Sequence, residues 1–202
     1  NNAATYFKSA AILNRKLYIG GYNKKNVDGI MERKTDGFIV SPPNKWLSIN
    51  TEDSIDVTVG DGDVITYTAG FGDKLLQYKK NKLYIINAGR QFEFLESEHP
   101  FMGVASQGHV VKTPFGIVWM NSNSVYHFDG KQIHDLFIDK GMNRIKDWSL
   151  SDGAIGYEPI NKKIFIRFAS TGSDGYIYDF TSNTWSEFGL NTMFTYTVGS
   201  EG

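Results

Sequence analysis

The stretch that most constrains the fold of this chain runs from residue 152 to residue 188, DGAIGYEPINKKIFIRFASTGSDGYIYDFTSNTWSEF. Four short segments rich in β-branched and aromatic residues are separated here by Gly, Asn, Asp, Ser and Pro. The segments are Ile155–Tyr157, Lys163–Ala169, Tyr176–Phe180 and Thr184–Phe188. Strong β-formers bounded by turn residues are typical of a meander of short strands. The stretch therefore predicts one complete four-stranded antiparallel unit.

The second strand of this unit recurs along the chain. Its copies are Lys16–Ile19, Lys82–Ile85, Gly116–Trp119 and Lys163–Ile166. The last two intervals are close to the ~40–50 residues of propeller repeats. A four-stranded sheet cannot bury both faces alone, so such units stack radially about a channel. We therefore predict an all-β protein, a β-propeller or part of one, with about four four-stranded antiparallel blades. The expected blades are residues 10–49, 60–97, 105–137 and 152–188.

Some local expectations are more specific. The first blade is expected to use strands at 10–13, 16–20 and 38–40 and a fourth, Trp-containing strand at 45–49. The one helix expected lies at 139–148. We treat residues 1–202 as a single propeller-like domain, and the start at Asn1-Asn2 leads us to expect a processed chain or a piece of a longer one.

Charge and composition restrict the classes of binding partner and the kinds of site that this chain can have. Lys plus Arg (21) nearly balances Asp plus Glu (22), which gives no electrostatic reason to expect nucleic acid or an anionic membrane as the main partner. The absence of cysteine excludes disulfides and thiolate metal sites. No apolar run approaches the ~18 residues of a membrane span.

The first and last blades resemble kelch repeats. Gly20-Gly21 is expected to end a strand in the first blade, and Tyr178 and Trp185 of the last blade are separated by six residues, which is the kelch tyrosine–tryptophan spacing. Phe38 and Trp46 are one residue further apart. The last blade has no Gly-Gly pair and the middle blades lack the Trp, so the resemblance implies a propeller fold and says little of function. A kelch-like propeller that binds protein or carbohydrate is the alternative that it suggests.

A second resemblance covers most of the chain. It rests on GDKLLQYKKNKLYII at 72–86, on Gly103-Val104, on HVVKTPFGIVWMNSNSVYHFDG at 109–130, and on segments 155–157 and 176–185. In this order the pieces resemble structural proteins of tailed-bacteriophage virions, in the neck, nozzle or tail-tube stabilising group. The resemblance implies a non-catalytic virion component. Its partners would be other virion proteins and copies of itself in a ring, near DNA in a central channel and away from membranes.

Several segments of the chain carry acidic residues that are candidates for a metal-binding or catalytic site. Asp61 and Asp63 in GDGD provide too few ligands for calcium and lack EF-hand spacing, so a turn is expected. Ser173-Asp174-Gly175 resembles part of a sialidase Asp-box, but Trp185 follows too late, and a turn is again expected. A propeller glycosidase, the third functional alternative, needs two carboxylates facing each other across a cleft. No pair is singled out among Glu32, Glu93, Glu96, Asp129 and Glu158.

Histidine, lysine and tryptophan residues complete the candidates. Zinc needs three or four converging ligands. The chain has four histidines, at 99, 109, 127 and 134, and only His127 and His134 are expected to meet, in a hairpin, which is too few for a zinc site. Lys79, Lys80 and Lys82 beside Tyr78 and Tyr84 could grip a nucleic-acid backbone, but a solvated hairpin tip is the preferred interpretation. Trp46 and Trp185 are expected at equivalent core positions between blades. We therefore predict no enzyme activity and no catalytic, cofactor-binding or metal-binding residues.

Overall fold

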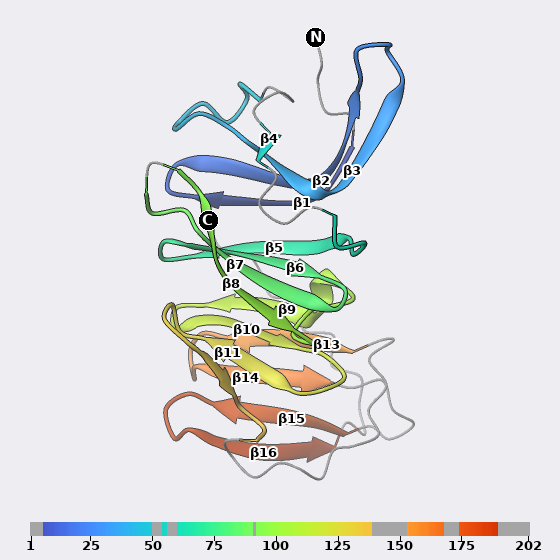
Figure 1. Cartoon of the computed structure of the whole chain (residues 1–202). Coiled ribbons are helices and arrows are strands. Elements are labelled where there is room, and N and C mark those ends of the chain that lie inside the picture. Colours follow the sequence, from blue (N-terminus) through green and yellow to red (C-terminus); the bar gives the residue numbers. More distant parts are fainter. Residues whose placement is uncertain are drawn as a thin grey trace. The chain divides into compact units, whose positions relative to one another are not determined.

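The structure is a computed structural model that describes residues 6–49, 54–55, 60–90, 92–138, 153–167 and 174–189. These residues form four sheets, each of four antiparallel strands in chain order, and the described part contains one short 3-10 helix, Gln107–His109 (Figure 1). The sheets divide into two compact units, residues 1–107 and 108–202. The predicted all-β architecture of four-stranded antiparallel blades is confirmed, and the single-domain assignment stays a prediction.

The strands have the following bounds. The first sheet contains β1 (Tyr6–Leu13), β2 (Lys16–Lys25), β3 (Met31–Val40) and β4 (Ser54–Ile55). The second contains β5 (Ile65–Phe71), β6 (Lys74–Lys79), β7 (Lys82–Asn87) and β8 (Phe94–Pro100). The third contains β9 (Val110–Thr113), β10 (Gly116–Met120), β11 (Val125–Phe128) and β12 (Ile133–Asp135). The fourth contains β13 (Ala154–Glu158), β14 (Lys163–Arg167), β15 (Asp174–Asp179) and β16 (Thr184–Gly189).

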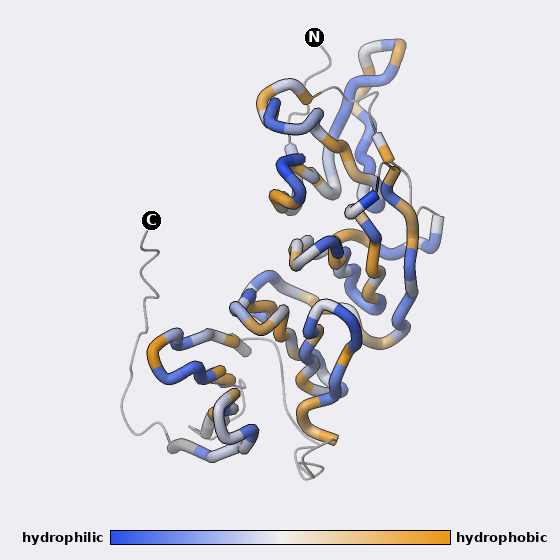
Figure 2. Tube along the Cα trace, turned by 90° about the vertical axis from the view of Figure 1, so that its left-hand side faces the viewer, coloured by the Kyte–Doolittle hydropathy of each residue, from blue (hydrophilic) through white to orange (hydrophobic). Residues whose placement is uncertain are grey.

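The core of the first unit lies between its two sheets, where β1 runs beside β5. The first sheet contributes Leu13, Tyr18, Phe38 and Val40, and the second contributes Ile65, Leu75, Ile86 and Ala88. Apolar and polar residues follow one another closely along the trace, as strands with alternating side-chain directions require (Figure 2). The central strands β6 and β7 are instead buried along nearly their whole length, so they position any residue they carry rigidly.

The second unit is built in the same way. Val118, Met120, Val125, Leu136 and Phe137 of the third blade pack against Ile164, Ile166 and Tyr178 of the fourth. The indole of Trp185 lies against this cluster, and its Nε1 donates a hydrogen bond to the carbonyl of Leu136 at 3.0 Å. The prediction that Trp185 belongs to an inter-blade core is therefore confirmed.

The first blade differs from the predicted one at its fourth strand. Residues 45–49 form turns and irregular structure, and β4 at 54–55 pairs with β3 instead. Pro42 and Pro43 cannot donate to a ladder, and Asn44 adopts a left-handed φ of 60°. Trp46 is 47% exposed and its Nε1 donates to the carbonyl of Arg15 at 3.1 Å. The equivalence of Trp46 with Trp185 was therefore wrong, and the approximate kelch spacing in the first blade is not a structural repeat.

Two other expectations about the first blade also change. The Gly20-Gly21 pair lies inside β2 rather than at the end of a strand, and the pairing of β2 with β3 shifts register between Gly20 and Tyr22. The first strand of this blade, expected at 10–13, is longer than predicted, because β1 begins at Tyr6. The helix expected at 139–148 lies outside the described residues.

In the described part of the chain, no helix has the length and apolar character needed to cross a membrane.

Candidate functional site

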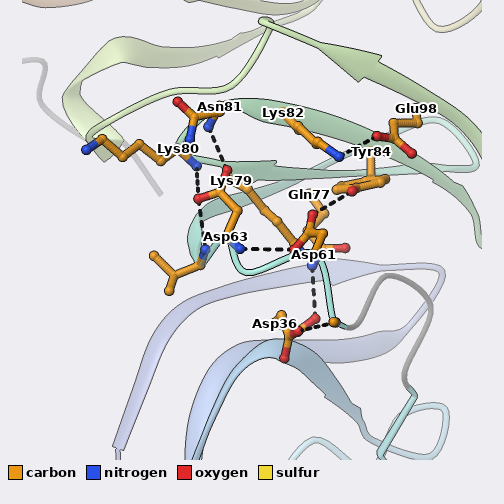
Figure 3. A network of polar contacts seen from close by, with 12 residues as sticks. Asp36, Asp61, Asp63, Gln77, Lys79, Lys80, Asn81, Lys82, Tyr84 and Glu98 are labelled. Atoms are coloured by element: carbon orange, nitrogen blue, oxygen red, sulfur yellow. Dashed lines mark hydrogen bonds and ion pairs between the residues drawn. The ribbon is translucent and has the colours of Figure 1, made fainter.

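The GDGD segment is the best-organised polar feature of the first unit. Gly60 and Gly62 have φ values of 86° and 76°, and the backbone N–H of Asp63 donates to Oδ1 of Asp61 at 3.1 Å. The residues lie in a bend just before β5, which confirms the predicted turn. The turn presents both of its carboxylates to the β6–β7 hairpin (Figure 3).

Asp61 holds a lysine and a tyrosine at once. Its Oδ1 accepts from Nζ of Lys79 at 2.6 Å, and its Oδ2 accepts from the hydroxyl of Tyr84 at 2.6 Å. Lys79 is the last residue of β6, and its side chain is 0% exposed. Its ammonium also lies 5.1 Å from the centre of the Tyr84 ring, within the range of a cation–π contact. The prediction that Lys79 belongs to a solvated hairpin tip was wrong, because this side chain points into the unit and is neutralised there.

The other two lysines of the hairpin have different roles. Asp63 accepts from the backbone N–H groups of Lys80 at 3.3 Å and Asn81 at 2.8 Å, so it fixes the turn itself. Nζ of Lys82 lies 2.8 Å from Oε1 of Glu98 on β8 (Figure 3). Lys79, Lys80 and Lys82 therefore do not form one basic patch.

The same turn also connects to the first sheet. Oδ2 of Asp36 on β3 accepts from the backbone N–H of Gly60 at 2.8 Å, and the carbonyl of Asp36 accepts from Nε2 of Gln77 at 3.3 Å. These hydrogen bonds connect β3 to β6. We call the whole set of residues the Asp61 network; it contains Asp36, Asp61, Asp63, Gln77, Lys79 and Tyr84.

The electrostatics of this network oppose acid–base chemistry near neutral pH. Burial alone would raise the pKa of Asp61, but the hydrogen bonds from Lys79 and Tyr84 outweigh it and lower the pKa to about 2. Burial and the hydrogen bond to Asp61 raise the pKa of Tyr84 to about 12. A general acid or base works best with a pKa near the operating pH, and both groups are far from it. The Asp61 network is therefore suited to joining blades rather than to catalysis.

The candidate carboxylates are engaged separately. Oε1 of Glu93 accepts from Nζ of Lys16 and from the hydroxyl of Tyr18, both at 2.8 Å. Glu96 pairs with Lys74 and Asn87, and Glu32 pairs with Lys34. Asp129 pairs with His134. The carboxylate of Glu158 accepts hydrogen bonds from the backbone N–H groups of Ile160 and Asn161 in the turn that follows β13. Each carboxylate thus has a structural role of its own.

The histidine hairpin is confirmed. His127 on β11 and His134 on β12 are cross-strand partners with ring centres 6.0 Å apart. Nε2 of His134 lies 3.1 Å from Oδ2 of Asp129, and Nε2 of His127 lies 3.0 Å from the carbonyl oxygen of Phe115. Burial, the largest influence, lowers the pKa of His127. Across the described ranges, no group of three or more His, Cys, Asp or Glu side chains is placed to hold a metal ion.

The other two histidines and the segment that resembles an Asp-box lie elsewhere in the chain. His99 lies on β8, where its Nε2 is 2.9 Å from the hydroxyl of Ser97, and His109 is buried at the end of the 3-10 helix. The turn expected at Ser173-Asp174-Gly175 was wrong for its last two residues, because Asp174 and Gly175 begin β15 and pair with β16. Ser173 lies outside the described residues.

Sequence reasoning missed a cavity of about 270 Å³ in the first unit. It is lined by residues of both sheets: Lys8, Gly21, Arg33, Thr35, Val64, Ile65, Thr66, Lys80 and Ala105. Three of these are basic and none is acidic. Lys8, Arg33 and Lys80 are far apart in the sequence, and no motif links them, so only the packing of the two sheets could bring them together.

The comparisons with known proteins bear on the fold. No family model matches this chain, and no curated protein matches it. Among solved structures the chain is similar to Sqt1 of Saccharomyces cerevisiae, a β-propeller, with 10% sequence identity and a TM-score of 0.52 over 89% of this chain. The chain spans about half of that structure, 47% of its length. It also aligns with the hemopexin fold protein CP4 from cow pea, at 8% identity and a TM-score of 0.32, over 93% of this chain and 92% of that one.

The four blades and the likeness to Sqt1 together confirm the predicted β-propeller fold. At 10% identity the likeness concerns the fold alone.

Proposed function

We propose that this chain is a non-catalytic interaction propeller that binds another protein through its first blade. The β-propeller fold supports this proposal only in a general way, because propellers serve many functions. The observation that carries it is the hairpin formed by the outer halves of β2 and β3, residues 22–34, which extends beyond the rest of its sheet (Figure 1).

The tip of this hairpin exposes three apolar side chains. Val27 is 102% exposed, Ile30 63% and Met31 43%, although the hairpin has a built turn in which Oδ1 of Asn26 accepts from the N–H groups of Asp28 and Ile30. Apolar side chains held in water by an ordered turn lose the free energy that their burial would provide, about 1.5–3 kcal/mol for each large side chain. Burial against a partner would recover it, as at the apolar centre of protein interfaces.

Site-specific photo-crosslinking tests the proposal. A photoreactive residue placed at Val27 is expected to give discrete protein adducts in extracts of the source cells, and the same residue at Ile160, which is 86% exposed in the second unit, is not. The adducts should disappear in a Val27→Ser/Ile30→Ser variant of unchanged melting temperature. Equal labelling from both positions, or none from Val27, would refute a binding surface at the hairpin tip.

The order of motifs along the sequence favours a more specific second candidate, a structural component of a tailed-phage neck, nozzle or tail. This role requires the chain to bind copies of itself and other virion proteins. Mass photometry of the purified protein, followed by mass spectrometry of virions, tests it. A discrete ring and presence in virions would support the role, and a strict monomer absent from virions would refute it. Saturable binding on a glycan array would instead support the carbohydrate-binding alternative.

A further inference from the structure

The cavity between the two sheets of the first unit is an unusual concentration of one sign of charge. Lys8 comes from β1, Arg33 from β3 and Lys80 from the β6–β7 turn, and all three are exposed. Within the described residues, none of the three side chains forms an ion pair, whereas Lys16, Lys74, Lys79 and Lys82 of the same unit all do. The ion-paired lysines of this unit therefore lie outside the lining of the cavity, and the three basic residues of that lining have no carboxylate partner among the described residues.

Three acidic residues of the Asp61 network are held by other groups. Both oxygens of Asp63 accept from backbone N–H groups of the β6–β7 turn, and Oδ2 of Asp36 accepts from that of Gly60. Asp61 is paired with Lys79. Three like charges that share one cavity repel each other, and a bound anion would convert this repulsion into attraction.

The backbone around the cavity is shaped in a way that brings Lys8 to it. Gly21 adopts a φ of 61° at the shift of register between β2 and β3, and a Cβ at this position would lie 2.9 Å from Cβ of Lys8. Bulges of this kind redirect side chains and are enriched beside functional sites. The Gly20-Gly21 pair thus has a local role, since only glycine leaves room for the Lys8 side chain here.

From this arrangement we propose that the cavity lined by Lys8, Arg33 and Lys80 binds the phosphate group of a small ligand. A planar guanidinium offers paired N–H donors to phosphate oxygens, and lysine ammonium groups add charge from two sides. Ile65 and Thr66, which are both buried, also line the cavity, so part of its wall is apolar. A volume of about 270 Å³ suits a phosphate with a small substituent, because drug-sized ligands occupy pockets of ~300–1,000 Å³. This site goes beyond the proposed protein contact at the hairpin tip, and Arg33, which pairs with Asn23, lies near the base of the same hairpin rather than at its tip.

Titration calorimetry with inorganic phosphate and with pyrophosphate, at constant ionic strength in chloride, tests the proposal. Saturable binding is expected, tighter for pyrophosphate, and each of Arg33→Gln and Lys80→Gln should weaken it about tenfold, since a charged hydrogen bond contributes roughly that much. Lys82→Gln is the matched control. It removes the same charge from the same hairpin, but Lys82 pairs with Glu98 outside the cavity, and it should change the affinity less than twofold.

Three results would overturn the proposal. The first is no binding at millimolar pyrophosphate by a wild-type protein with a cooperative melt. The second is equal loss of affinity in Lys82→Gln and Arg33→Gln, which would indicate general charge attraction. The third is binding of a ten-nucleotide single strand more than a hundredfold tighter than pyrophosphate with the same dependence on Arg33, which would assign the cations to a nucleic-acid backbone. Gly21→Ala provides an independent check, because displacement of Lys8 should weaken pyrophosphate binding while the ordered hairpin tip is retained.

Discussion

The buried ammonium of Lys79 allows a sharp prediction about the Asp61 network. Lys79 is 0% exposed and the Asp61 side chain is 16% exposed, so the two partners differ in their access to water. Asp61→Asn leaves a buried cation without this carboxylate, a change that typically costs 3–5 kcal/mol. Because an amide can still bind Tyr84 and the site is partly open, we expect the lower end, a loss of about 3 kcal/mol in the free energy of unfolding.

The reverse substitution should be much milder. Lys79→Met replaces a buried cation by an apolar side chain of similar length, and water can reach the carboxylate that remains. We expect a loss of less than about 1 kcal/mol, and the double variant Asp61→Asn/Lys79→Met should recover most of the stability lost in Asp61→Asn. Asp28→Asn, at the exposed hairpin tip, is the matched control for loss of one carboxylate and should be neutral.

Urea denaturation followed by far-UV circular dichroism, with hydrogen exchange of the β6 and β7 amides, measures these differences. The pKa of Asp61 is lowered from 3.8 to about 2 on folding, so its contribution is complete above pH 3.8 and is lost as the pH falls toward 2. The gap between the wild type and Asp61→Asn should therefore close over that interval. If Asp61→Asn costs no more than Asp28→Asn, or if Lys79→Met is the more harmful of the two single changes, the reasoning from unequal burial is refuted.

Three further predictions concern the second unit and the first blade. Trp185→Ala should lower the free energy of unfolding by about 3 kcal/mol because it empties a core position, whereas Trp46→Ala, at a 47% exposed side chain, should cost less than about 1 kcal/mol in urea titrations. Gly116→Ala should abolish a cooperative melt of the second unit, because Gly116 has a φ of 141° and an added Cβ would lie 1.9 Å from a backbone oxygen. Gly156→Ala is the control and should fold, because an added Cβ there would have no atom within 4 Å. NMR titration should give His127 a pKa below 6.5, because burial favours its neutral form in the folded state. The free energy of unfolding should therefore decrease as the pH falls below 6.5, and this decrease should be absent in His127→Gln.

Local sequence signals were sufficient wherever strands are short and turns are marked by Gly, Asn and Asp. The strands of the last three sheets lie in or close to the predicted blades at 60–97, 105–137 and 152–188, but Asp174 and Gly175, which were expected in a turn, belong to β15. The prediction failed at residues 45–49, where the Trp suggested a strand by analogy with Trp185. Two prolines and a left-handed Asn44 turn the chain there, and a two-residue strand at 54–55 completes the blade. A residue type at similar spacing does not guarantee the same backbone.

The sequence by itself determined the repeated four-stranded unit, the all-β class and the turn at GDGD, because these depend on alternation and on residues with local backbone preferences. Only the tertiary structure decided what the charged residues do. It gave the three lysines of the β6–β7 hairpin different partners: Lys79 is buried with Asp61, Lys82 pairs with Glu98, and Lys80 lines the cavity. It also brought Lys80 together with Lys8 and Arg33. Charge has no periodicity along a strand, so its partners are set by which sheets pack together, and that information is not local.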